Sequence, residues 1–154
     1  MMEIAARQAM SLIAFTLPGT PFSARMARFY IRAALDYHDL DDYAEDIETV
    51  ASELVSNAIA HAGARSFGLE LLRLEDSGAI AVVVTDPCPR APAMHHPAEN
   101  AEHGRGLVIV EALSASWGWT RHDHGKAVFA IFPREGWPVE AISALPRLDH
   151  LDAD

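Results

Sequence analysis

ELVSNAIAH, residues 53–61, carries two patterns on one predicted helix. Glu53, Asn57 and His61 recur at every fourth position, and because a helix advances by about 100° per residue, all three lie on one face. Beside this polar row runs an apolar stripe made of Ile47, Val50, Ala51, Leu54 and Ala58. The helix can therefore pack into a core along the stripe while it presents three polar groups to a ligand.

The residue types of the polar row suit phosphate chemistry assisted by a metal ion. A carboxylate such as Glu53 can accept a proton from an attacking hydroxyl or water. One turn later, the amide oxygen of Asn57 can bind Mg²⁺ without adding a second negative charge. The solvated face of an ordinary amphipathic helix has the same spacing, so this helix alone leaves both interpretations open.

A second polar feature comes at the end of a predicted strand. Residues 80–85 form a short β-branched run typical of a buried strand, and this run ends at Asp86, followed by Pro87. Ligands of α/β sheets bind at strand ends, where a carboxylate can accept a hydrogen bond from the amino group of a base. An aspartate that simply begins a turn is the alternative.

A glycine turn follows in HGRGLVIVEALS, residues 103–114. Gly104 and Gly106 let the backbone turn sharply and approach a ligand closely. A helix that begins at Gly106 or Leu107 would direct free amide hydrogens into the turn, which favours a phosphate there. Glycines that only punctuate a loop give the same pattern, so the turn by itself does not decide between the two readings.

In this order, the three segments resemble the GHKL family of ATPases and kinases, which includes histidine kinases, gyrase and anti-sigma factor kinases. ELVSNAIAH is similar to the N box of the family, DPCPRAP at 86–92 to its first glycine box, and HGRGLVIVEAL at 103–113 to its second. LPGTPFSARMARFYIRAAL at 17–35 and GKAVFAIF at 125–132 are similar to small stand-alone anti-sigma factor serine/threonine kinases. The resemblance covers residues 12–133.

This resemblance implies a role for each position. Glu53 would be the catalytic base, Asn57 the Mg²⁺ ligand and Asp86 the carboxylate that recognises adenine. ATP and Mg²⁺ would be the cofactors, and the phosphate-facing turn would comprise Gly104, Arg105, Gly106 and Leu107. His61 matches a position near the phosphates, although a histidine at a helix end can equally bond the last carbonyls.

The last hairpin and the first glycine box match the family less simply. Lys126 corresponds to a common lysine of the hairpin, and a solvated turn residue is the alternative. The first glycine box normally has glycines two and four positions after the aspartate, where this chain has Cys88 and Arg90. A side chain at Cys88 can crowd the adenine, whereas Arg90 can either reach a phosphate or face water.

Hydrophobic patterns predict an α/β (α+β) two-layer sandwich, with a mixed, mostly antiparallel sheet and helices on one face. Strands are expected at 12–17, 66–75, 79–85, 116–122 and 126–132, and helices at 20–36, 41–62 and from 106 or 107 onward. The first helix is expected to face the core with Phe22, Met26, Phe29 and Ala33. Residues 1–11 would be a leader, 12–133 the ATP-binding domain and 134–154 an extension with a short helix and an acidic tail.

The composition of the chain indicates which kinds of partner it can bind and in which compartment it is expected. The chain has 154 residues, 50% of them hydrophobic, which fits a single folded domain. Its 12 Lys and Arg are outnumbered by 22 Asp and Glu, and the net charge of −10 argues against direct binding to nucleic acid. One cysteine excludes an internal disulfide, and the absence of a long apolar run argues against a membrane span, so a cytoplasmic location is expected.

Three functions are compatible with these features. The resemblance implies a serine/threonine protein kinase that phosphorylates an anti-sigma factor antagonist and sequesters a sigma factor, in a family whose members commonly form homodimers. A nucleotide-gated binding module without catalysis is the second, and a histidine-kinase catalytic domain acting in trans is the third. Glu53 favours the first function, whereas Cys88 and Arg90 favour the second.

Overall fold

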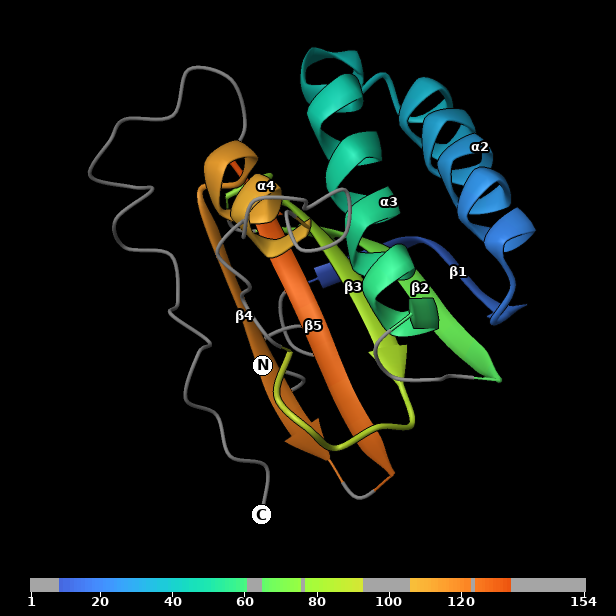
Figure 1. Cartoon of the computed structure of the whole chain (residues 1–154). Helices are drawn as coiled ribbons and strands as arrows, with labels where there is room; N and C mark the ends of the chain where they lie inside the picture. The colour runs from blue at the N-terminus through green and yellow to red at the C-terminus, as the bar shows by residue number, and fades with distance from the viewer. Residues whose placement is uncertain (1–8, 61–64, 76, 93–105, 123, 134–154) are drawn as a thin grey trace.

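A five-stranded antiparallel sheet forms one layer of the molecule, and helices cover one of its faces (Figure 1). The computed structural model describes residues 9–60, 65–75, 77–92, 106–122 and 124–133. The strands are β1 (Ala9–Pro18), β2 (Ser66–Leu74), β3 (Ile80–Asp86), β4 (Ser116–His122) and β5 (Gly125–Phe132). The helices are α2 (Pro21–Tyr37), a short 3₁₀ turn η1 (Asp41–Tyr43), α3 (Ala44–Ala60) and α4 (Gly106–Leu113). The predicted two-layer sandwich is confirmed.

The strands pair in the order β1-β2-β3-β5-β4, which makes β3 and β5 central neighbours. Both faces of β5 are buried, as its continuous apolar sequence indicates. Val128, Ala130 and Phe132 belong to the core beneath the helices, whereas Ala127, Phe129 and Ile131 belong to a second apolar cluster on the opposite face. The central strands are therefore held from both sides, which fixes the positions of their ends.

Helix α3 lies between α2 and α4 and packs on β3 (Figure 1). Its predicted apolar stripe is confirmed, because Ile47, Val50, Ala51, Leu54 and Ala58 are all at most 2% exposed. The α-helix begins at Ala44, after the 3₁₀ turn, rather than at the predicted residue 41. This packing places Asn57 of α3 close to Asp86 at the end of β3.

The expectation for the face of α2 is wrong. Phe22 and Phe29 are each 66% exposed, and the residues that α2 buries are Ser23, Ala27, Ile31, Ala34 and Leu35. Both rows have helical spacing, so the periodicity alone does not separate them. The buried row consists mainly of smaller side chains, which allow α2 to lie close against α3.

The first strand is longer than expected, since it begins at Ala9 rather than at residue 12. The other strands lie within a residue or so of their predicted bounds. The predicted extension at 134–154, and the loop residues 93–103, lie outside the described residues. Among the helices that the structure describes, none is long and apolar enough to cross a membrane.

Candidate functional site

A cavity of about 230 Å³ opens beside α3, at the ends of β3 and β5. Its lining residues are Leu54, Asn57, Ala58, Val84, Asp86, Cys88, Arg90, Ala91, Pro92, Lys126 and Val128. The walls are mainly apolar, with polar groups from Asn57 on α3, Asp86 on β3 and Lys126 on β5. Two segments that the sequence places far apart, the N box and the strand end, therefore contribute to one cavity, as ligand sites require.

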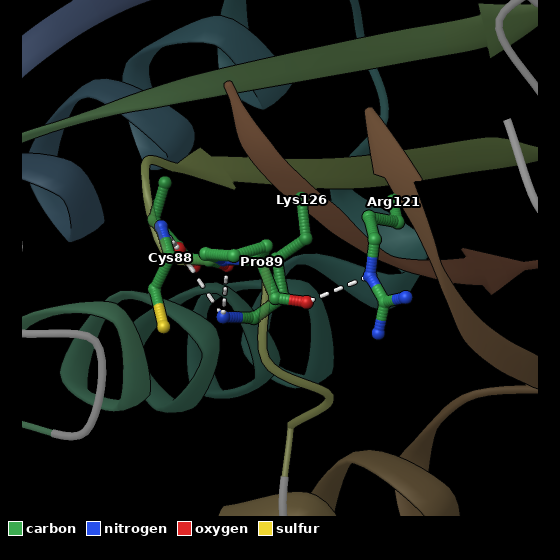
Figure 2. A network of polar contacts seen from close by, with 5 residues as sticks. Cys88, Pro89, Arg121 and Lys126 are labelled. Atoms are coloured by element: carbon green, nitrogen blue, oxygen red, sulfur yellow. Dashed lines mark hydrogen bonds and ion pairs between the residues drawn. The ribbon is translucent and has the colours of Figure 1, made fainter. Parts of the chain in front are cut away.

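A buried ion pair lies at this cavity. The Lys126 ammonium Nζ is 3.1 Å from the Asp86 carboxylate Oδ1, and the two side chains are 7% and 2% exposed. The same ammonium donates to the Cys88 carbonyl at 3.1 Å, while the Cys88 backbone N–H donates to Asp86 Oδ1 at 2.8 Å (Figure 2). The alternative interpretation of Lys126 as a solvated turn residue is therefore wrong. The pairing follows from strand register, because Asp86 and Lys126 are direct neighbours across β3 and β5.

Cations hold the loop after β3 in place. Besides the bond from Lys126 to Cys88, Arg121 Nε donates to the Pro89 carbonyl at 2.9 Å (Figure 2). The Arg121 guanidinium also lies over the Trp119 ring, 5.5 Å from its centroid. Sequence reasoning missed Arg121, whose only signal was its place in the last hairpin, where it pairs directly with Lys126.

Gly125 is required by the close approach of β3 to the last hairpin. Its φ of 153° is unfavourable for other residues, and a Cβ at this position would overlap the backbone carbonyl of Asp86. The end of β3 therefore lies directly over Gly125. This contact sets the position of the Asp86 backbone, while hydrogen bonds from the Cys88 N–H and the Lys126 ammonium orient its carboxylate.

Cys88 occupies the cavity wall at the position where the family motif has its first glycine. The hydrogen bonds from Arg90, first from its side chain and then from its backbone, hold the pKa of the Cys88 thiol below its usual value. The thiol and Arg90, which both line the cavity, therefore interact with each other. A side chain is thus present where the motif would leave space for a base.

Glu53 lies one turn before Asn57 on α3 and is half-buried. Partial burial raises the pKa of the Glu53 carboxyl above its usual value, and the positive charge of Arg28 opposes this shift. A raised pKa makes a carboxylate a stronger base, as proton transfer requires. Glu53 is not among the described residues that line the cavity, whereas Leu54 and Asn57 of the same helix are.

The second glycine box is described only in part. Gly106 begins α4, and the side chain of Leu107 is 2% exposed within the main core. Leu107 therefore offers a ligand only its backbone amide, in the first turn of the helix. His61, Gly104 and Arg105 lie outside the described residues.

The described residues fit the base end of a nucleotide. The cavity is smaller than the roughly 300–1,000 Å³ typical of small-molecule sites, and it offers apolar walls with one carboxylate and one ammonium. Apolar walls suit a flat base, and the charged pair supplies an acceptor and a donor for its edge. Asn57 can supply one oxygen to Mg²⁺, whose other ligands are commonly phosphate oxygens and waters.

Comparison with known proteins agrees with this fold. Residues 17–132 match the model of the family described as the histidine kinase-like ATPase domain. The fold is similar to the RsbU and RsbW domains of Rv1364c from Mycobacterium tuberculosis, with a TM-score of 0.59 and 21% identity over 79% of this chain and 32% of that chain. It is also similar to a protein in the SiaB-SiaC complex from Pseudomonas aeruginosa, with a TM-score of 0.61 and 17% identity over 85% of this chain and 94% of that chain.

The two structural likenesses concern the fold, and this chain spans only about a third of the Mycobacterium protein chain. No curated protein sequence is similar enough to count as a match. The family match includes the N box, Asp86 and the last hairpin, so it confirms the resemblance that these motifs indicated. The chain belongs to the family of histidine kinase-like ATPase domains.

Proposed function

We propose that this chain binds ATP with Mg²⁺ and transfers its γ-phosphoryl group to a serine or threonine of an anti-sigma factor antagonist. In the same proposal, the chain sequesters a sigma factor while the antagonist is phosphorylated. The observation that carries the proposal is the position of Glu53, a carboxylate with a raised pKa, one turn before the cavity residue Asn57. The resemblance of the chain to small anti-sigma factor kinases supports the choice of acceptor.

Each residue has a defined part in this reaction. Asp86 would accept a hydrogen bond from the base, and Asn57 would hold the metal ion, which would supply positive charge to the phosphates. Glu53 takes the proton of the acceptor hydroxyl as its oxygen bonds to the γ-phosphorus. The bond between the γ-phosphorus and the bridging oxygen breaks, and ADP leaves with that electron pair.

Phosphate transfer from labelled ATP to a candidate antagonist tests the kinase proposal. Glu53→Gln should lower the transfer rate by about 10²- to 10⁴-fold and leave ATP affinity nearly unchanged, because a general base acts mainly on the barrier. Asn57→Ala should weaken Mg²⁺-dependent binding as well as turnover. Glu45→Gln is the matched control, since Glu45 is an exposed carboxylate in the first turn of the same helix.

A nucleotide-gated binding module is the second candidate, and Cys88 is the observation that favours it. Its side chain lies in the cavity wall where the family motif has a glycine, which disfavours tight binding of the base. The antagonist and the sigma factor should first be identified by pull-down with the wild-type protein. If the wild type then binds ATP and both partners but transfers no phosphate, the binding module replaces the kinase as the function.

A further inference from the structure

Among the residues that the structure describes, only two accept hydrogen bonds from the Lys126 ammonium, which leaves one of its donors for a ligand. An ammonium carries three N–H donors, and the two acceptors recorded for Lys126 are Asp86 Oδ1 and the Cys88 carbonyl. The side chain is 7% exposed, and Lys126 lines the cavity. A buried donor at a cavity wall is best satisfied by an acceptor on whatever occupies the cavity.

The Asp86 carboxylate also has an oxygen, Oδ2, that can accept a hydrogen bond from a ligand. Both recorded donors to Asp86, the Cys88 N–H and the Lys126 ammonium, bond to Oδ1. No described residue donates to Oδ2 in the recorded bonds, and Asp86 lines the same cavity as Lys126. The cavity therefore offers a ligand one donor and one acceptor side by side.

This pair changes which bases the site can select. A lone carboxylate favours a purine with an amino group at position 6, because it accepts from that amino group and repels a carbonyl oxygen. The edge of a 6-oxopurine instead presents the O6 acceptor beside the N1–H donor. A neighbouring ammonium and carboxylate complement that edge as well as they complement the N6–H donor and N1 acceptor of adenine.

We propose that the site accepts 6-oxopurine nucleotides, GTP and ITP, as well as ATP, with Lys126 donating to O6 and Asp86 accepting from N1–H. Lys126 is then a specificity-determining residue, because without its ammonium the carboxylate would face the carbonyl oxygen of the base. The inference rests on the proposed nucleotide site, and it adds the class of base that the site takes.

Equilibrium binding of ATP, GTP and ITP, each with Mg²⁺, to the full chain tests the inference. The wild type should bind ITP within about tenfold of ATP. Lys126→Met should weaken ITP relative to ATP by at least about tenfold, because the Asp86 carboxylate then repels O6 of ITP but still accepts from the N6 amino group of ATP. Lys126→Gln retains an N–H donor and should keep part of the ITP affinity. Arg73→Met, which removes a positive charge from β2 away from the cavity, should leave the ratio unchanged.

The wild-type measurement alone keeps the inference falsifiable if a Lys126 variant does not fold. Wild-type binding of ATP with ITP and GTP more than about a hundredfold weaker overturns the inference and leaves the proposed function intact. An ATP-to-ITP ratio that Lys126→Met does not change also overturns it. Binding of none of the three nucleotides overturns both the inference and the proposed nucleotide site.

Discussion

At the scale of single residues, the Asp86–Lys126 ion pair has the strongest energetic consequences. Both side chains are almost fully buried, so removing one partner leaves an uncompensated charge in the interior. Asp86→Asn should lower the free energy of unfolding by about 3–5 kcal/mol, as is usual for a broken buried pair. Urea unfolding of the purified variant measures this loss.

The double variant Asp86→Asn with Lys126→Met is the control for that prediction. It removes both charges and keeps side chains of similar volume, so most of the lost stability should return. A double variant that is no more stable than Asp86→Asn would show that the charges are not what couples the two positions. The comparison also matters for binding experiments, because a single Asp86 variant can lose nucleotide affinity simply by unfolding.

The ionised carboxylate of Glu53 should lower the free energy of unfolding at neutral pH. Burial raises its folded pKa above the unfolded value, so the favourable protonated form is present in acid and is lost as pH rises through the folded pKa. Glu53→Gln mimics the protonated carboxyl and should be more stable than the wild type near pH 7, by a small amount because the group is half-exposed. The two proteins should converge near pH 4, close to the ordinary pKa of glutamate.

Urea unfolding at both pH values measures the difference between the two proteins. Glu45→Gln, the exposed position on the same helix, should show no such pH-dependent gain. A Glu53→Gln variant that is less stable than the wild type near pH 7 would mean that the ionised carboxylate makes a stabilising contact, and it would count against Glu53 as a strained catalytic group.

At the scale of elements, the sequence predicts the strands well and one helix face poorly. Strand positions follow from β-branched runs and turn residues, which are local signals. The apolar stripe of α3 is also local, since only one row of that helix is continuously apolar. Helix α2 has two such rows, and only its packing against α3 selects the one that is buried.

The site residues divide in the same way, into those that local sequence patterns predict and those whose positions depend on long-range packing. Asn57 and Asp86 share a cavity, as the order of the family motifs indicates. The burial of Lys126 depends instead on the register of β3 against β5, which joins residues 40 positions apart. The hydrogen bond from Arg121 to Pro89 also depends on the pairing of β4 with β5, which places Arg121 beside Lys126. Turn length sets the register of the β4–β5 hairpin, but no local pattern in the sequence specifies the register of β3 against β5, on which both contacts depend, so neither contact was predictable from it.

The two rows of α2 lead to a direct test. Ile31→Ala removes a fully buried side chain and should cost about 2–5 kcal/mol of unfolding free energy, through lost burial and a residual cavity. Phe29→Ser, at a position that is 66% exposed, should change stability by no more than about 0.5 kcal/mol. Chemical denaturation of the two variants gives both values. A larger loss for Phe29→Ser would mean that the exposed aromatic row is covered in solution.

At the scale of the whole molecule, the cavity lies between the helix layer and the sheet, at the ends of β3 and β5. The sheet supplies Asp86 and Lys126 from strands buried on both faces, and α3 supplies Asn57 from the covering layer. A ligand in the cavity therefore contacts both layers at once. Occupancy should consequently stabilise the fold as a unit, since binding to the folded state alone shifts the unfolding equilibrium by mass action.

This linkage predicts the effect of ATP on thermal unfolding. ATP at about 100 times its Kd should stabilise the fold by about 2.7 kcal/mol, which corresponds to a rise in Tm of roughly 5–10 °C for a domain of this size. Part of the shift should require Mg²⁺, and Asn57→Ala should remove that part while it keeps the part seen with EDTA, because Asp86 and the apolar walls remain. Scanning calorimetry with ATP, with and without Mg²⁺, measures each contribution. A Tm that saturating ATP with Mg²⁺ leaves unchanged would contradict nucleotide binding, whereas a full shift in Asn57→Ala would assign the metal ligand to another residue.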